Sequence, residues 1–283
     1  MKIEYISTFL EIAECGNFNR AADNLNVTQS TVSARVKLME DRFGRRLFKR
    51  GHAGVELTSA GQQFLQYAHN IQRQWQQAKQ RIALPERFNH TIGLGSQVSL
   101  WDSLILKWMP WMRKNAAEIA LHVEADYSPS LMRQVSDGLL DIGVMYHPRQ
   151  TSGLIIEDLF EETLILVTTD KEAVDGAWVK DYVFVDWGEL FRARHSEAFP
   201  DLETPAISVG LGALGLEYIL QNGGAGYFPV RVVKSLIENQ TLLTVNNTPN
   251  LQRPAYMVYA SAARDPSSLN IALQVLREAA TSE

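Results

Sequence analysis

The sequence predicts an α/β protein with an N-terminal all-α winged helix-turn-helix, a long linker helix and a two-lobed C-terminal domain. Three observations predict this fold class. Residues 17–50 hold two apolar patterns of helical spacing that a tight turn separates. Residues 64–82 carry a heptad pattern. From residue 91 onward, predicted strands alternate with predicted helices, and 283 residues suffice for two or three domains.

Positive charge is concentrated near the N-terminus, although the whole chain has a net charge of −5. Residues 1–88 hold 13 Lys and Arg against 8 Asp and Glu, a net of +5, and the remainder holds 14 against 24, a net of −10. A basic head on an acidic body is typical of a DNA-binding module joined to a domain with another task.

Several features indicate a cytoplasmic protein without a membrane partner. The single Cys15 excludes an internal disulfide and fits a reducing compartment. The opening MKIEYISTFLEIAEC is amphipathic and acidic, unlike a signal peptide. No apolar run approaches the roughly 20 residues that a membrane-spanning helix needs.

The helix-turn-helix begins with a bracing helix over residues 3–15. Helical spacing of apolar residues recurs over 18–25 and 32–39, and residues 26–28 form a tight turn between them. Thr28 is a favourable N-cap, because its hydroxyl can accept from free amides of the next turn. Short hydrogen-bonding side chains and cations at a helix N-terminus suit the DNA major groove. The candidate DNA-binding residues here are Thr28, Gln29, Ser30, Thr31, Ser33, Arg35 and Lys37.

A β-hairpin wing is predicted after this helix. A basic run covers residues 45–50, a turn follows at 51–54, and a short strand returns at 55–57. The basic run could reach phosphates or the minor groove, and a solvated basic loop is the alternative. Two further candidate DNA-binding residues are Lys49 and Arg50.

One long helix is predicted from residue 59. Ser59 and Gln62 match a capping box, and Pro85 ends the helix. Its apolar stripe is typical of a coiled-coil face, so we expect a second copy of the chain as partner, with packing on the chain's own body as the alternative. The candidate dimerisation residues are Phe64, Ala68, Ile71, Trp75, Ala78 and Ile82.

The run AADNLNVTQSTVSARVKLMEDRFGRRLFKR, followed by LTSAGQQF and a long helix, resembles the N-terminal domain of LysR-type transcriptional regulators. The chain departs from the family pattern at Met39-Glu40, where Leu-Glu is usual, and at Ala34, where Arg often follows the serine. The resemblance is close over the first 84 residues and looser beyond them. The matching residues are Ala21-Ala22, Leu25, Thr28-Gln29-Ser30, Val32-Ser33, Leu47-Phe48, Arg50, Leu57-Thr58 and Ala60-Gly61.

The resemblance implies a bacterial, sequence-specific regulator of transcription that binds a double-stranded DNA operator as a homodimer or homotetramer. RNA polymerase is a further candidate partner. The resemblance also implies an effector domain similar in fold to periplasmic solute-binding proteins, in which closure around a small effector is the expected switch. We expect no enzymatic activity, no metal site and no cofactor, and the sequence does not identify the effector.

The C-terminal domain is expected to contain two α/β lobes joined by two crossing strands. The predicted strands are 91–95, 119–125, 140–145, 183–185, 207–209, 226–228 and 255–259, and the predicted helices are 98–113, 130–137, 214–221 and 269–279. The expected domains are 1–58 for the winged helix-turn-helix, 59–84 for the linker and dimerisation helix, 91–167 plus 250–283 for lobe I, and 168–249 for lobe II.

The effector site is expected beyond the carboxyl ends of the strands, where open α/β sheets bind ligands. Ser96 and Gln97 precede a predicted helix whose exposed amides favour an anion, so we expect a small anionic effector. Capping or loop chemistry without a ligand is the alternative for each position. The candidate effector-binding residues are Ser96, Gln97, Val98, Tyr146, His147, Leu211, Gly212, Phe228 and Pro229.

Other patterns leave alternatives open. The run from Gly210 to Gly215 matches the G-x-G-x-x-G of dinucleotide folds, but no acidic residue clearly ends a following strand. Trp108 and its neighbouring tryptophans pack in a core or form a subunit interface. We expect His195 in a solvated loop. Two other function classes compete with a regulator. One is a solute-binding or enzymatic module with a DNA-binding head, and the other is a nucleoid-type architectural protein.

Overall fold

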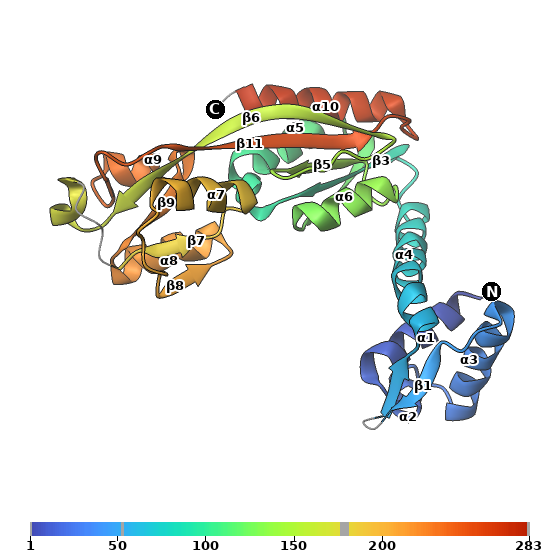
Figure 1. Ribbon diagram of the computed structural model, residues 1–283. Helices are drawn as coiled ribbons and strands as arrows, with labels where there is room; N and C mark the ends of the chain where they lie inside the picture. The colour runs from blue at the N-terminus through green and yellow to red at the C-terminus, as the bar shows by residue number, and fades with distance from the viewer. Residues whose placement is uncertain (1, 52–53, 176–180, 282–283) are drawn as a thin grey trace. The chain divides into compact units, whose positions relative to one another are not determined.

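The computed structural model describes residues 2–51, 54–175 and 181–281. It comprises two compact units, Met1–Pro85 and Glu86–Glu283, which we call the head and the body and describe separately (Figure 1). Among the described residues, no helix has both the length and the apolar character that a membrane crossing requires.

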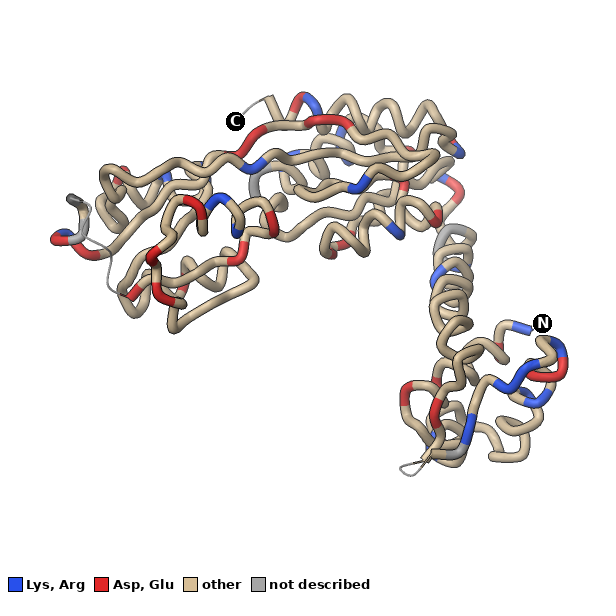
Figure 2. The backbone as a smooth tube through the Cα atoms, in the orientation of Figure 1, with Lys and Arg blue, Asp and Glu red and all other residues tan. Residues whose placement is uncertain are grey.

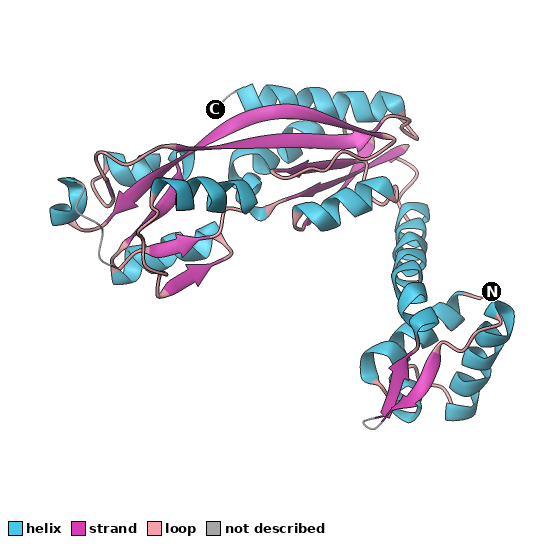
Figure 3. Cartoon of the chain, viewed as in Figure 1, coloured by secondary structure: helices cyan, strands magenta, loops and turns pink. Residues whose placement is uncertain are grey.

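In its described residues, the head has four helices and a β-hairpin in the order that the sequence predicts (Figure 3). The hairpin strands pair antiparallel, from Phe48 opposite Leu57 to Gly51 opposite Gly54. The elements of the head are α1 (Ile3–Cys15), α2 (Phe18–Asn24), α3 (Gln29–Phe43), β1 (Phe48–Gly51), β2 (Gly54–Leu57) and α4 (Ser59–Ile82).

Short polar side chains and a glycine set the ends of the head helices. Asn17 Oδ1 caps α2 by accepting hydrogen bonds from two amides of its first turn, at 2.8 and 3.2 Å. Thr28 Oγ1 caps α3, as predicted, by accepting from the amide of Thr31 at 3.2 Å. Gly44 ends α3 with a φ of 63°, in the left-handed region that favours glycine. The tight turn between α2 and α3 therefore has well-defined ends.

A single apolar core holds the head together. The Phe9 ring on α1 lies at its centre, 5.2 Å from the ring centroid of Phe48 on β1 and 4.8 Å from that of Phe64 on α4. Val32 and Met39 bury the inner face of α3 against the same core. The first turns of α4 are therefore part of the head rather than a separate linker.

The body alternates strands and helices along most of its length. Its elements in lobe I and the first crossing strand are β3 (His90–Ser96), η1 (Val98–Leu100), η2 (Trp101–Ile105), α5 (Leu106–Asn115), β4 (Ile119–Ala125), α6 (Ser128–Ser136), β5 (Ile142–Met145) and β6 (Leu154–Thr168). The remaining elements are η3 (Lys171–Asp175), β7 (Val183–Val185), α7 (Glu189–Ala198), β8 (Ile207–Val209), α8 (Gly212–Asn222), β9 (Ala225–Pro229), α9 (Val230–Glu238), β10 (Leu243–Thr244), β11 (Leu251–Ala260) and α10 (Pro266–Thr281).

Among the described residues of the body, seven strands form one sheet in the order β10-β6-β11-β5-β3-β4, with β9 paired to β6. A parallel pair of β7 and β8 forms a second, smaller sheet. The strands β6 and β11 pair antiparallel over most of their length, and Figure 1 shows them as the long ribbons that run through the body. They are the two crossing strands that the sequence predicts.

Each lobe has its own apolar core. Lobe I packs β3, α5 and α10 around residues such as Leu94, Trp108 and Leu276, and lobe II packs β7, α8 and β9 around residues such as Val185 and Tyr227. The crossing strands contribute to both cores, since Leu251 of β11 lies in lobe II whereas Ala255 and Met257 lie in lobe I. The crossing strands are therefore the continuous connection between the lobes.

Two expectations about the body need correction. The sheet is not parallel throughout: β3 pairs parallel with β4 and β5, whereas β11 pairs antiparallel with β5 and β6. The reason is that β6 leads from lobe I to lobe II, whereas β11 leads back from lobe II to lobe I, so the two long strands run in opposite directions. The segment predicted as one helix over 98–113 begins with the 3-10 turn η1 and the π turn η2 before α5 starts at Leu106.

His195 is not in a solvated loop. It lies in α7, is 4% exposed, and its Nε2 atom is 2.8 Å from the hydroxyl of Tyr182. The rings of Phe184, Phe191 and Phe199 surround it with centroid distances of 5.2–5.3 Å. The charged residues of α7 and its short length hide this burial from the sequence pattern. Burial lowers the pKa of His195.

Packing explains the glycine motif and the central tryptophan. A Cβ on Gly212 would lie 2.1 Å from the Trp187 ring, and one on Gly215 would lie 2.7 Å from Val185, so both glycines let α8 approach its neighbours. Trp108 is fully buried in the core of lobe I, and its Nε1 donates to the carbonyl of Ala272 at 3.0 Å. Close packing therefore accounts for the second and third glycines of the G-x-G-x-x-G run without a dinucleotide.

Candidate functional site

The N-terminal turn of α3 presents hydrogen-bonding side chains to solvent. Thr28, Gln29 and Ser30 are exposed, whereas Thr31 and Ser33 are half-buried. The Thr28 hydroxyl lies 2.9 Å from the hydroxyl of Ser30, and Gln29 Nε2 donates to Ser33 Oγ at 2.9 Å. These contacts order the side chains along one edge of the helix, where they can meet base edges.

Arg35 lies differently from the expectation that it faces solvent. It is half-buried, and its Nη1 donates to the hydroxyl of Thr8 on α1 at 3.0 Å. Thr8 is fully buried and donates in turn to the carbonyl of Glu4 at 2.7 Å. Arg35 therefore joins α3 to α1, and this contact, which the sequence pattern cannot show, occupies the guanidinium inside the head.

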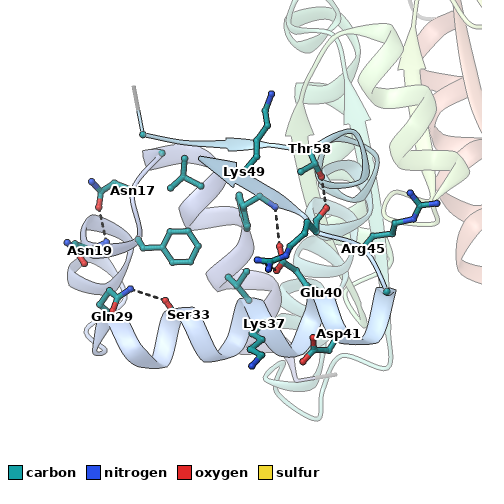
Figure 4. A pocket seen from close by; sticks show the side chains of 18 residues that line it. Asn17, Asn19, Gln29, Ser33, Lys37, Glu40, Asp41, Arg45, Lys49 and Thr58 are labelled. Atoms are coloured by element: carbon teal, nitrogen blue, oxygen red, sulfur yellow. Dashed lines mark hydrogen bonds and ion pairs between the residues drawn. The ribbon is translucent and has the colours of Figure 1, made fainter. Parts of the chain in front are cut away.

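A groove runs between α3 and the β-hairpin (Figure 4). Lys37 of α3 and Lys49 of β1 line it, with Asn17 and Asn19 at one end and Arg45 at the other. Lys37 and Lys49 are exposed, and Lys49 Nζ is 3.3 Å from a carboxylate oxygen of Glu56. The side chain of Arg50 lies outside the described residues. The polar residues at the ends of this groove were not among the candidates, because Asn17 and Asn19 belong to the start of α2 and Arg45 follows the end of α3.

Positive charge follows the chain from the end of α3 into the hairpin. Figure 2 shows Lys and Arg along this part of the head, which contains Arg42, Arg45, Arg46 and Lys49. Such a run is suited to the phosphates beside a groove that α3 enters. The head therefore combines exposed hydrogen-bonding side chains on α3 with cations that follow it along the chain.

Glu40 fixes the hairpin to α3. Its carboxylate is buried and accepts from the amide of Leu47 at 2.7 Å and from that of Phe48 at 3.3 Å, and Arg46 lies 3.6 Å from its other oxygen. Gly61 allows the same segment to approach α4, since a Cβ there would lie 2.2 Å from the carbonyl oxygen of Leu47. The hairpin is therefore held in place by specific contacts rather than by its turn alone.

The predicted seam of α4 divides into two parts. Ala68 is fully buried in the head, and Phe64 contacts Phe9 and Phe43 with centroid distances of 4.8 and 4.9 Å. Further along, Ile71 is 39% exposed, Trp75 48% and Ile82 85%, whereas Ala78 is half-buried. Only the second part of the seam leaves large apolar side chains uncovered.

A cavity of about 850 Å³ lies in the body between lobes I and II. Gln97, Val98, Tyr146, His147, Leu211 and Gly212 line it, which brings together six of the nine predicted effector-binding residues. Ser96, Phe228 and Pro229 are buried and do not line it. The cavity therefore lies beyond the strand ends, where it was expected, although three of the predicted residues are buried beside it instead.

The segment after β3 begins with a 3-10 turn rather than with the α-helix that the sequence predicts. Gln97 Oε1 accepts from the hydroxyl of Ser128 at 2.9 Å and from the amide of Tyr146 at 3.0 Å. Ser96 Oγ donates to the carbonyl of Gln97 at 3.2 Å, and the following 3-10 turn has only three residues. Gln97 therefore ties β3, α6 and the end of β5 together at the cavity wall.

A buried ionic cluster next to the cavity was not predicted. Arg253 on β11 is 5% exposed and pairs at 3.4 Å with Glu162, its partner in the antiparallel register of β6. Arg231 at the start of α9 donates to Glu162 at 2.7 Å and to the carbonyl of Ser99 in lobe I. Glu162 and Arg253 are 91 positions apart, so only the strand register reveals the pair.

Aromatic groups enclose this cluster. Arg253 Cζ lies 3.2 Å from the ring centroid of Tyr146 and 5.0 Å from that of Trp187. Burial raises the pKa of Tyr146 to about 12, and its hydroxyl donates to Glu162 at 3.2 Å. Burial also lowers the pKa of Arg253, although a guanidinium remains charged at any ordinary pH.

His147 joins the two lobes at the cavity. It follows β5 of lobe I and makes a hydrogen bond with the backbone of Trp187 in lobe II. Gly188 has a φ of 105°, and a Cβ there would lie 2.2 Å from His147 Nε2. Burial and, after it, the charge of Arg253 lower the pKa of His147, so the ring is neutral at physiological pH. Among the described residues, no cluster of His, Cys, Asp or Glu could hold a metal ion.

Family models match both parts of the chain. Residues 3–62 match the model described as a bacterial regulatory helix-turn-helix protein of the lysR family, and residues 86–281 match the LysR substrate binding domain. The chain belongs to the LysR family. It is a LysR-type DNA-binding transcriptional regulator.

Similar proteins agree with this assignment. The HTH-type transcriptional regulator HdfR of Escherichia coli O7:K1 is 29% identical over 262 residues, which cover 92% of each chain. Full-length CbnR, solved with its target DNA, has a TM-score of 0.75 at 17% identity and covers 99% of this chain and 100% of its own. Full-length LysG of Corynebacterium glutamicum, solved with the effector Arg, has a TM-score of 0.57 at 17% identity and covers 100% and 99%. The relatives of this LysR-type chain are named as regulators and not as enzymes.

Proposed function

We propose that this LysR-type regulator reads an operator in the bacterial cytoplasm through α3 and the β-hairpin. We further propose that a small effector in the body cavity controls how tightly the protein binds this DNA. The observation that carries the proposal is the groove between α3 and β1, which Gln29 and Ser33 line together with the exposed cations Lys37 and Lys49. Uncharged side chains that can read bases and cations that can contact phosphates are both required for specific recognition.

The solved neighbours support both halves of the proposal. CbnR was solved with its target DNA, and LysG was solved with a bound effector. In this chain the corresponding features are the head groove and the cavity between lobes I and II. A protein with these two sites can make DNA binding depend on a small molecule if the ligand favours one arrangement of the chain.

A homodimer is part of the proposal. The exposed apolar side chains of Ile71, Trp75 and Ile82 follow one face of α4 and suit a second copy of the same helix. Two copies would present two recognition helices to an imperfect palindrome, which increases the length of DNA that is read. A pair of such dimers would form a tetramer.

Operator binding gives the direct test. DNA fragments are selected from a random pool with the full-length protein, and fluorescence anisotropy then measures affinity as a function of salt. We expect Ser30→Ala to reduce discrimination between selected and random DNA. Lys37→Ala should weaken binding to selected and to random DNA alike. If Lys37 neutralises one phosphate, the plot of log affinity against log salt concentration should also become less steep, by about 0.9.

Lys114→Ala on α5 of the body is the matched control, because it removes an exposed cation outside the head. Its affinity for DNA should equal that of the wild type. Equal affinity for selected and random DNA in the wild type would contradict a regulator with an operator and favour an architectural DNA-binding protein.

A further inference from the structure

The wall of the body cavity contains a buried cluster with more positive than negative charge. Glu162 accepts from Arg231 Nε at 2.7 Å and from Arg253 Nη1 at 3.4 Å, so one carboxylate faces two guanidinium groups. A third donor to Glu162, the Tyr146 hydroxyl, is neutral. Since water hardly screens charges at this depth, incomplete pairing of the second cation is unfavourable.

Arg253 is the cation of this cluster that lines the cavity. Its Nε atom is buried and has no hydrogen-bond partner among the described residues. Buried donors in folded proteins are almost always paired, so an unpaired donor on a buried arginine that lines a cavity shows that the hydrogen-bonding capacity of this side chain is not fully used. The Tyr146 ring covers one face of the guanidinium at 3.2 Å, and the donors of the guanidinium all lie in its plane.

Arg192, Asp186 and Asp126, which also line the cavity, have partners. Arg192 donates to both carboxylate oxygens of Asp186, at 2.8 and 2.7 Å. Asp126 accepts from the amide of Tyr127 at 2.8 Å and from Gln134 at 3.1 Å. The buried charge that is only partly neutralised is therefore located at Arg253.

We propose that the effector is a small carboxylate and that the guanidinium of Arg253 is its anchor. This inference rests on the proposed function, because it names the chemical class of the effector. The carboxylate supplies the second negative charge of the cluster and accepts from the guanidinium in the plane of the arginine fork. A planar carboxylate fits beside the Tyr146 ring, whereas a tetrahedral phosphate directs an oxygen out of that plane.

A ligand panel tests the chemical class. The melting temperature of the full-length protein is measured with benzoate, lactate and succinate, with the matched amides benzamide, lactamide and succinamide, and with inorganic phosphate, all at one ionic strength. We expect a rise of roughly 2–4 °C for at least one carboxylate at several times its Kd. The matched amide and phosphate should give no rise.

Variants of Arg253 test the anchor. Arg253→Gln removes the cation, and Arg253→Lys keeps the charge without the fork, so both should raise the Kd for the active carboxylate by at least about tenfold. Arg277→Gln is the matched control, because Arg277 also pairs with a glutamate of β6, at 2.7 Å from Glu157, but does not line the cavity. Its Kd should stay at the wild-type value.

A measurement without ligand distinguishes an anchor from a structural residue. Arg253→Gln leaves Glu162 paired with Arg231, so its ligand-free melting temperature should be no lower than that of the wild type. Glu162→Gln leaves two cations facing each other, so its ligand-free melting temperature should be several degrees below that of the wild type. A ligand-free Arg253→Gln protein that melts several degrees below the wild type would show that Arg253 serves the fold instead.

The same samples separate this inference from the proposed function when their binding to selected DNA is also measured. If an amide or a cation, but no carboxylate, changes both stability and DNA binding, the carboxylate class is overturned and the effector-controlled regulator stands. If no compound changes either property while DNA binding is specific, the carboxylate anchor is overturned and so is control by an effector. A response that persists unchanged in Arg253→Gln overturns the anchor alone.

Discussion

Two polar side chains of α3 make the internal contacts that orient the DNA-reading part of the head. Arg35 donates to the buried hydroxyl of Thr8 on α1, and the buried carboxylate of Glu40 accepts from two amides of the hairpin segment. Both contacts join α3 to a neighbouring element, so they fix the orientation of this helix within the head. We predict that both residues contribute to DNA binding by positioning α3.

The role of Arg35 can be measured through the stability of the head. Arg35→Ala removes a hydrogen bond between a charged donor and a buried hydroxyl, which should destabilise α1 and α3 by about 1–2 kcal/mol. Hydrogen exchange of their amides in the full-length protein should then be faster by roughly 5–30-fold. Lys37→Ala, which removes an exposed cation two residues away, should leave exchange unchanged. Unchanged exchange in Arg35→Ala together with weaker DNA binding would instead favour a direct contact with DNA.

His195 makes the stability of lobe II depend on pH. Burial among aromatic rings lowers its pKa, so the folded state holds the neutral form whereas the unfolded chain takes up a proton near the usual value of about 6.5. Its contribution to stability is therefore complete above about pH 6.5 and declines as the pH falls from there toward the lowered pKa of the folded state. The pKa of His147 is lowered as well, so its protonation also reduces the stability of the folded state as the pH falls.

Replacing His195 should therefore reduce the pH dependence. The free energy of unfolding of the wild type is expected to fall between about pH 6.5 and 5 with a slope of at most about 1.4 kcal/mol per pH unit from this group. His195→Gln should show a smaller slope in urea titrations across this window. His69→Gln, at an exposed position of α4, should keep the wild-type slope. Equal slopes in all three proteins would contradict a neutral, buried His195.

At the scale of elements, the single heptad pattern of α4 runs through two different packing environments. Its first turns belong to the head core through Phe64 and Ala68, and its later turns expose Ile71, Trp75 and Ile82. A heptad pattern records only that one face is apolar, and it contains no information about which partner covers that face. The division along α4 follows from the position of α1, which packs against its beginning.

The exposed part of α4 predicts how the protein associates. Trp75→Glu would place a charge at the centre of the proposed helix–helix contact, so the dimer should dissociate at protein concentrations at least about tenfold higher than in the wild type. Sedimentation velocity over a range of micromolar concentrations measures this. Gln76→Glu adds the same charge at the neighbouring exposed position and should leave the dimer intact. Sedimentation of Trp75→Glu that matches the wild type would argue against α4 as the interface.

At the scale of the whole molecule, two compact units divide the work between a DNA-reading head and a body with a cavity. Within the body, the crossing strands β6 and β11 carry the buried pair of Glu162 and Arg253, and Arg231 joins that pair to lobe I through Ser99. A ligand at Arg253 would therefore act on the strands that connect the lobes. Coupling of this kind needs only a difference in ligand affinity between two arrangements.

The sequence by itself determined the order of elements and indicated the family. The informative patterns were local ones: periodic apolar residues, the Thr28 cap and the Leu57-Thr58 segment. Local patterns can be recognised without knowledge of the fold. They also placed six residues of the cavity wall, because strand ends in an α/β sheet meet at one edge.

Only the tertiary structure decided which polar side chains face inward. Arg35 bonds to Thr8 across 27 positions, His195 is enclosed by rings from three segments, and Arg253 meets Glu162 through a strand register. Charged and polar residues carry no apolar period, so their burial depends on partners that the fold brings from far along the chain. For the same reason the sequence pattern led to Ser96 and Gln97 as the expected anion site, whereas the anchor that we propose is Arg253.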